Sequence, residues 1–97
     1  MQASVRKYKI DPAQMDEVAR RVEEKFVSRV SQLPGFGAYH FVEVGNGILI
    51  TVTVCDDPEA VAQSADLAAE FVGDELSDVE IERVEAATGE VTVSRTA

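Results

Sequence analysis

The stretch 34–54, PGFGAYHFVEVGNGILITVTV, predicts two β-strands joined by a tight turn at Gly45-Asn46-Gly47. One helical pattern precedes this hairpin and another follows it, so the predicted order is strand, helix, strand, strand, helix, strand. This order is typical of an α+β, ferredoxin-like fold, in which a four-stranded antiparallel sheet carries both helices on one face. We therefore expect residues 1–97 to form a single domain of this class.

The first strand and helix are marked by a clear boundary. A strand is expected from about Ser4 to Ile10, and Asp11 is expected to cap the helix that follows. Pro12 suits the first helical position, and Gln14 is placed to complete a capping box. Apolar residues then recur every three or four positions until Pro34-Gly35, which predicts an amphipathic helix of about five turns.

The second helix and the last strand follow the hairpin. Asp57-Pro58 repeats the helix-start pattern, and the helix is expected to end by Ser77. The segment 79–94 alternates at each end around Thr88-Gly89, and is either one long strand bent by a bulge or a small hairpin. We expect the bent strand, because Ala86-Ala87 would be a poor hairpin partner for the valines that follow.

Both hairpin strands are apolar on both faces. The first is expected to place Phe36, Ala38, Val42 and Val44 opposite Tyr39 and Phe41, and the second to place Ile48, Ile50, Val52 and Val54 opposite Leu49 and Cys55. A sheet with helices on one face and water on the other should instead alternate apolar with polar residues. Two helices can cover only one face, so we expect a second copy of the chain to cover the other, giving a homodimer.

Charge and composition exclude several classes of partner. The formal net charge is −9, and residues 41–97 hold only two bases, Arg83 and Arg95. Nucleic acids and anionic membranes are therefore poor partners. Residues 1–4 lack the features of a signal peptide and no apolar run approaches a membrane span, so a soluble, cytoplasmic protein is expected. Cys55 is the only cysteine, which rules out an intrachain disulfide.

Taken together, these motifs resemble the dimeric α+β barrels of the antibiotic biosynthesis monooxygenase-like superfamily, particularly its small bacterial members of unassigned function. The resemblance rests on the Asp-Pro helix starts and on several short stretches: Val5-Arg6-Lys7-Tyr8, residues 16–24, Pro34-Gly35-Phe36, Gly45-Asn46-Gly47 and residues 89–93. It implies two ferredoxin-like protomers packed sheet to sheet, each with a pocket between helices and sheet. Members with known activity oxidise aromatic polyketide-like compounds with oxygen, without metal or flavin, or degrade haem, using pocket Asn, Trp, Tyr or His residues.

This sequence departs from those activity patterns. It has no Trp, its only Asn is Asn46 in the turn, and its second helix carries no His. The haem-degrading pattern is therefore absent and the monooxygenase pattern is partial. The resemblance specifies the fold far better than the activity.

Three side chains are candidate catalytic residues. His40 is the sole histidine, suited to act as a general base, although a structural histidine at a dimer interface or sheet edge fits equally. Tyr8 and Tyr39 lie on neighbouring elements of the predicted sheet, where a phenol can hydrogen-bond a substrate oxygen or simply complete the core. No metal and no cofactor are expected, because one His and one Cys offer no ligand spacing.

Charged groups give weaker signals. Arg6, Lys7 and Lys9 interrupt the apolar pattern of the first strand, either to neutralise a carboxylate or phenolate ligand or to reach the sheet ends and pair with acids. Asp56, Asp57 and Glu59 lack the spacing of a calcium loop and are explained by the start of a helix.

Two functions from different classes fit these observations. One is a cofactor-independent monooxygenase that acts on a small aromatic or quinol-like compound through Tyr39, His40 and Tyr8. The other is a non-catalytic dimer, binding a small hydrophobic ligand or another protein, for example in a stress response. In either case the site is expected between helices and sheet, under Phe26, Val30, Leu67 and Phe71.

Overall fold

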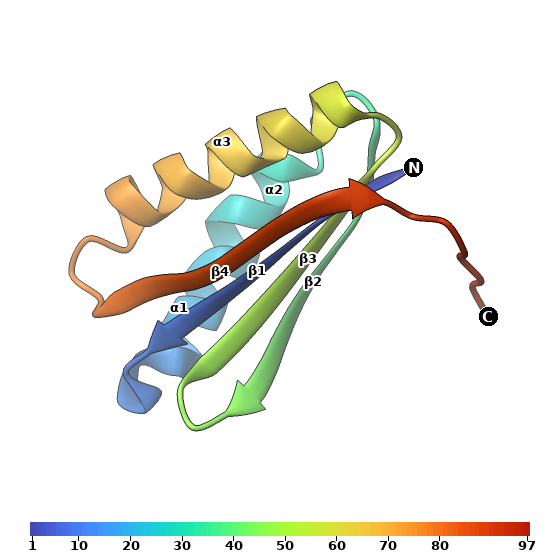
Figure 1. Cartoon of the computed structure of the whole chain (residues 1–97). Helices are drawn as coiled ribbons and strands as arrows, with labels where there is room; N and C mark the ends of the chain where they lie inside the picture. The colour runs from blue at the N-terminus through green and yellow to red at the C-terminus, as the bar shows by residue number, and fades with distance from the viewer.

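The computed structural model describes all 97 residues and has the predicted order of strands and helices (Figure 1). The strands are β1 (Gln2–Ile10), β2 (Phe36–Gly45), β3 (Ile48–Cys55) and β4 (Ile81–Glu90). They form one antiparallel sheet in the order β2-β3-β1-β4. The helical segments are η1 (Pro12–Gln14), α1 (Met15–Arg21), η2 (Val22–Phe26), α2 (Val27–Val30) and α3 (Pro58–Glu75). The helical segment from η1 to α2 and the helix α3 lie on the same face of the sheet, which confirms the ferredoxin-like α+β prediction.

The first helix is continuous from α1 through α2 but contains one turn of π-helix, η2. Its buried stripe consists of Val18, Val22, Phe26 and Val30, spaced by four residues each. In an α-helix of 3.6 residues per turn, each four-residue step rotates the side chain by about 40° away from the previous one. The wider turn of η2 offsets that drift, so all four side chains face the sheet.

Both predicted aspartate caps are present, but the predicted capping box is wrong. Asp11 accepts a hydrogen bond from the backbone N–H two residues on (3.0 Å), and Asp57 from the one three residues on (2.8 Å). The Gln14 side chain instead accepts from the backbone N–H of Glu80 (3.2 Å), and the Asp11 N–H donates to the Glu80 carbonyl (3.4 Å). The chain entering β4 therefore takes both partners that the box would have used.

The β2–β3 turn has the predicted form. Asn46 and Gly47 both have positive φ, 57° and 78°, as a type I′ turn requires. The Gly47 carbonyl accepts a hydrogen bond from the Ile10 N–H at 2.7 Å. The hairpin tip is thereby tied to the end of β1.

Three register shifts, at Gly37 and Val44 in β2 and at Val84 in β4, interrupt the alternation of side chains in the sheet. The register of β2 slips at Gly37, so Phe36 lies opposite Cys55 and packs against the core. The prediction that Phe36 shares a face with Ala38 is therefore wrong. The segment 79–94 forms one strand, as expected, but its register shift lies at Val84 and not at Thr88-Gly89, and residues 91–97 have no regular secondary structure.

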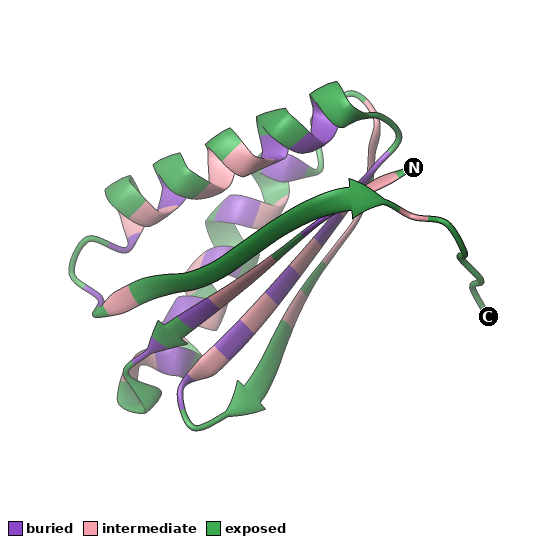
Figure 2. Cartoon of the chain, viewed as in Figure 1, coloured by how far each residue is buried: buried purple, intermediate pink, exposed green.

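The two faces of the sheet differ in cover. The helix-facing side holds the main core, which includes Tyr8, Leu49 and Phe71. On the other side the apolar residues stay accessible, and Val42 and Val44 are 45% and 58% exposed. Figure 2 shows how buried and partly exposed positions alternate along β3, whereas β4 is exposed along most of its length. No helix is both long and apolar enough to cross a membrane.

Candidate functional site

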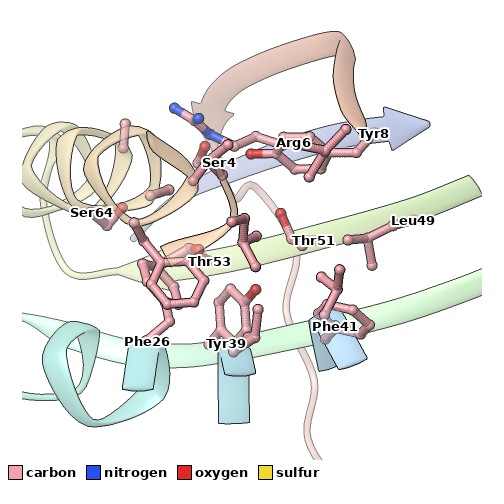
Figure 3. A pocket seen from close by; sticks show the side chains of 18 residues that line it. Ser4, Arg6, Tyr8, Phe26, Tyr39, Phe41, Leu49, Thr51, Thr53 and Ser64 are labelled. Carbon is pink, nitrogen blue, oxygen red and sulfur yellow. The ribbon is translucent and has the colours of Figure 1, made fainter. Parts of the chain in front are cut away.

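An apolar cavity lies between the helices and the sheet (Figure 3). Of the four residues predicted to cover a site there, Phe26 and Phe71 line the cavity, whereas Val30 and Leu67 do not. It has 18 lining residues, of which 13 are hydrophobic, drawn from all four strands, the first helix, α3 and Leu76 just after α3. Small side chains of α3, Ala65 and Ala68, leave the space that larger residues would fill. The cavity measures about 40 Å³. A water molecule needs roughly 10–15 Å³ of such space, so the cavity has room for only a few waters.

Tyr8 and Tyr39 both line this cavity, but they do not lie on neighbouring strands as predicted, because β3 separates β1 from β2 in the sheet. The Tyr39 ring packs edge-on against Phe26, with ring centroids 5.2 Å apart and planes at 61°. Phe26 in turn contacts Phe71, with centroids 5.4 Å apart. This aromatic row fixes the Tyr39 ring, and its hydroxyl points among the lining side chains (Figure 3).

The environment of Tyr39 sets its chemistry. Burial, with a smaller contribution from Tyr8 nearby, raises the pKa of Tyr39 well above its usual value. The phenol therefore stays protonated at neutral pH. It is equipped to donate a hydrogen bond to a ligand oxygen and is a poor base.

His40 does not join the two tyrosines. It lies opposite Val52 on β3. The buried residues of β3 are Leu49, Thr51, Thr53 and Cys55, so Val52 belongs to the other face of the sheet. His40 is exposed and sits on the face of the sheet that the helices leave open. The structure thus brings Tyr8 and Tyr39 together at one cavity and separates them from His40.

The three basic residues of β1 divide between the two faces. Arg6 shares the helix-facing side with Tyr8 and lines the cavity, whereas Lys7 lines a shallow groove on the open face with Val5 and Ile50. Lys9 lies at the far end of the sheet in an open depression beside Asn46. Asp57 and Glu59 stand at the start of α3, and no group of three His, Cys, Asp or Glu side chains is arranged to hold a metal ion.

Sequence reasoning missed the hydroxyls and the second arginine of the site. Ser4, Thr51, Thr53 and Ser64 are buried and line the cavity. The sequence pattern that could have found Thr51 and Thr53 is the alternation of β3, which puts both threonines on the same buried face as Leu49 and Cys55. The second arginine, Arg83, lines a groove that adjoins the cavity, and its position depends on the register shift in β4.

Searches of known proteins return structural likeness alone. No family model matches the chain, and no curated protein matches it. Among solved structures, a proposed antibiotic biosynthesis monooxygenase from Deinococcus radiodurans has a TM-score of 0.78 at 13% identity, covering 100% of this chain and 98% of that one. SnoaB, a cofactor-independent oxygenase from Streptomyces nogalater, has a TM-score of 0.68 at 13% identity, with coverage of 96% and 94%.

A dimeric ferredoxin-like protein from an uncultured marine organism matches with a TM-score of 0.75 at 14% identity, covering 99% of this chain and 97% of that one. At such identities, likeness over the whole length establishes a common fold and leaves the activity open. The chain therefore has the ferredoxin-like α+β fold that its motifs predicted, and it shares this fold with these solved structures.

Proposed function

We propose that the protein is a cofactor-independent monooxygenase that oxidises a small aromatic or quinol-like compound between the helices and the sheet. The observation that carries this proposal is the apolar cavity with two phenols, Tyr8 and Tyr39, among its lining residues. An apolar pocket with a few convergent polar groups is the usual form of a small-molecule site. The fold that the chain shares with SnoaB, a cofactor-independent oxygenase, supports the same class of reaction.

The chemistry requires an electron-rich substrate and oxygen. A hydroxylated aromatic loses a proton to solvent water, and the resulting anion passes one electron to O₂. The two radicals recombine, and return of a proton from water gives a hydroperoxide, whose O–O bond then breaks with loss of water. One substrate carbon exchanges two hydrogens for a carbonyl oxygen, and the other oxygen atom leaves as water. Tyr39, protonated and held by Phe26, would donate a hydrogen bond to the substrate anion, with Tyr8 as a second donor.

We also propose that the working form is a homodimer joined through the open sheet face. Val5, Val42, Val44 and Val84 are 42–58% exposed there, an unusual set for a surface strand in water. His40 belongs to the same face and would lie at or near the partner. If His40 takes part in catalysis as predicted, its side chain would have to act from outside the cavity.

A second function is favoured by the size of the cavity. A space of about 40 Å³ cannot enclose an aromatic ring without movement of the surrounding side chains. This supports a non-catalytic dimer that binds a small hydrophobic ligand at the same place. The two functions share a site and differ only in turnover.

The distinguishing experiment measures oxygen uptake with a panel of hydroxylated naphthalenes and anthrones. The oxygenase is expected to consume one O₂ per carbonyl formed, unaffected by a metal chelator. Tyr39→Phe should lower kcat/KM by about tenfold or more, since one hydrogen-bond donor to the developing anion is lost. His40→Ala serves as the matched control and should keep the wild-type rate.

Two outcomes decide between the functions. Binding of a panel member without oxygen uptake would establish the non-catalytic protein. Oxygen uptake that survives Tyr39→Phe but is lost in His40→Ala would contradict the proposed roles of these two residues.

A further inference from the structure

We propose that Arg6 and Arg83 form an anion-binding mouth to the cavity, so that its ligand is an aromatic compound carrying a carboxylate or another anionic oxygen group. This inference rests on the proposed ligand site and specifies which compounds it accepts. It starts from the distribution of charge. The chain carries nine Lys and Arg residues against eighteen Asp and Glu residues, and five of the nine bases, Arg6 and Arg83 among them, belong to no ion pair.

Four of the nine basic residues form ion pairs with carboxylates. The six ion pairs of the structure use Arg20, Arg21, Lys25 and Arg29 of the first helix. Arg6 and Arg83 belong to none of them. They are also the only two bases that line the spaces between α3 and the sheet.

The register shift in β4 explains why Arg6 faces no acid across the sheet. Tyr8 lies opposite Arg83, but Lys7 lies opposite Glu85, because Val84 is passed over. In a regular pairing Val84 would face Lys7, and Glu85 would stand directly opposite Arg6 on the helix-facing side. The extra residue puts Glu85 on the open face with Lys7 and places the small Ala86 opposite Arg6.

The same arrangement supplies room for a ligand. A groove of about 320 Å³ is lined by Arg6, Tyr8, Ala69, Val72 and Arg83. Arg6, Tyr8 and Val72 also line the inner cavity, so the groove and the cavity adjoin one another and share these three residues. In Figure 3 the Arg6 guanidinium extends to the edge of the cluster, away from Phe26 and Phe41. Groove and cavity together reach the few hundred Å³ typical of small-molecule sites.

The basic groove and the apolar inner cavity together predict the orientation of the ligand. Guanidinium groups bind carboxylates and phenolates through paired N–H donors, and are less strongly hydrated than ammonium groups. The anionic group would therefore lie between Arg6 and Arg83 in the groove. The ring would point inward to the apolar residues, with its own hydroxyl within reach of Tyr39.

The test compares 6-hydroxy-2-naphthoate, whose hydroxyl and carboxylate stand at opposite ends of the rings, with its neutral amide, 6-hydroxy-2-naphthamide, by calorimetry and by chemical-shift mapping on the full chain. The acid is expected to bind at least about tenfold more tightly than the amide. Arg83→Gln and Arg6→Gln should each remove most of this preference and leave amide binding little changed. Arg6→Lys should restore part of it, because the charge returns without the paired donors. Arg95→Gln, which removes the same charge from the tail, should have no effect.

The outcomes separate this inference from the proposed function. If acid and amide bind equally, or if the arginine variants keep the preference, the anion-binding mouth is wrong while the ligand site stands. If neither compound binds, both proposals fail. Arg83 is exposed, so Arg83→Gln is expected to fold even if Arg6→Gln does not.

Discussion

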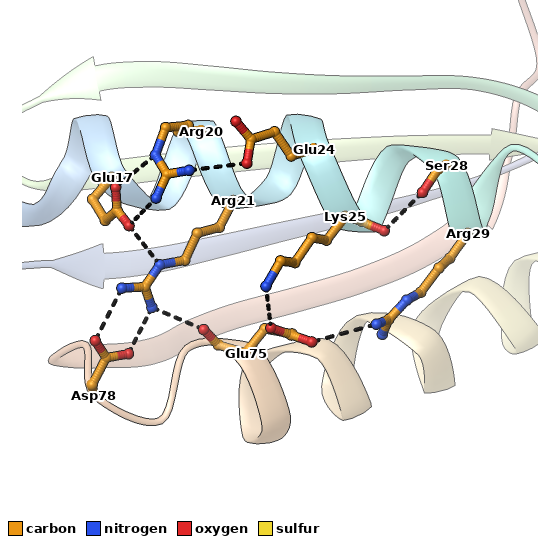
Figure 4. A network of polar contacts seen from close by, with 9 residues as sticks. All are labelled: Glu17, Arg20, Arg21, Glu24, Lys25, Ser28, Arg29, Glu75 and Asp78. Atoms are coloured by element: carbon orange, nitrogen blue, oxygen red, sulfur yellow. Dashed lines mark hydrogen bonds and ion pairs between the residues drawn. The ribbon is translucent and has the colours of Figure 1, made fainter.

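Arg21 holds both carboxylate oxygens of Asp78, with Nη1–Oδ1 at 2.6 Å and Nη2–Oδ2 at 3.0 Å (Figure 4). Its Nη1 also donates to the backbone carbonyl of Glu75 at 2.9 Å. The Glu75 carboxylate in turn pairs with Lys25 and Arg29, at 3.0 and 3.4 Å. These contacts join the first helix to the end of α3, and so hold together the two helices that cover the cavity.

The carboxylates of this network should make stability depend on acid. Hydrogen bonds from Arg20 and then Arg21 lower the pKa of Glu17 from 4.5 to about 2. Arg21 lowers the pKa of Asp78, and Lys25 lowers that of Glu75. A pKa that is lower in the folded chain favours folding above the unfolded value, and that contribution is lost as pH falls through the folded one.

We therefore expect the free energy of unfolding to fall between about pH 4.5 and pH 2, as measured by urea denaturation across that range. Glu17→Gln should flatten the curve in this window. Glu23→Gln, on the same helix but outside the ion pairs, should leave its shape unchanged. An equal slope in wild type and Glu17→Gln would show that the Glu17 carboxylate is not responsible.

Gly47→Ala should strongly destabilise the fold. A Cβ at this position would come within 2.3 Å of the Ile10 carbonyl oxygen, and the φ of 78° is unfavourable for any residue with a side chain. The left-handed conformation alone costs about 1–2 kcal/mol, before the clash is counted. The measurement is the free energy of unfolding in urea.

The matched control is Gly73→Ala in the last turn of α3. A Cβ there meets nothing within 4 Å, and the helix gains about 1 kcal/mol from the better helix former. The two substitutions add the same methyl group and should change stability in opposite directions. A mild effect at Gly47 would mean that the hairpin tip does not pack against β1.

Features decided by neighbours in the sequence were predictable, and features decided by distant contacts were not. The turn at Asn46-Gly47 and the Asp57 cap depend on local backbone geometry, and both were predicted. The capping box failed because Glu80, far along the chain, competes for Gln14.

The same division holds for the candidate site, where positions set by local sequence were predictable and those set by distant contacts were not. Strand alternation suffices to place Tyr39 toward the helices and His40 away from them. The meeting of Arg6 with Arg83 was not predictable, because it depends on a register shift at Val84 that the alternation of β4 does not mark. The cavity itself arises from how side chains of two helices and four strands pack, which no single segment encodes.

Cys55 should be inert in the folded protein. Its side chain is fully buried, and burial raises the pKa of the thiol above its usual value. The reactive thiolate is therefore scarce as well as inaccessible. A thiol-specific reagent at pH 8 should modify the native protein at least about a hundredfold more slowly than the protein in urea, because reaction awaits opening of the fold. Equal rates in the two conditions would contradict this burial.

The dimer gives the last prediction. Val52 lies in the middle of β3 on the open face, and Val5 of β1 is paired with it across the sheet. If this face meets its counterpart on a second copy, light scattering at micromolar concentration should give about twice the 10.5 kDa chain mass. The midpoint of thermal unfolding should also rise with protein concentration, since folding and association are linked.

Val52→Asp would place a charge at the centre of that interface, where its desolvation has no compensation. We expect the variant to scatter as a single chain and to lose the concentration dependence of its unfolding. Gln63→Asp adds the same charge on the exposed side of α3 and should remain a dimer. Because water solvates the aspartate in a monomer, Val52→Asp should still fold, although less stably. A wild-type protein that stays monomeric at all concentrations, or a Val52→Asp variant that stays dimeric, would mean that the open sheet face is not the interface.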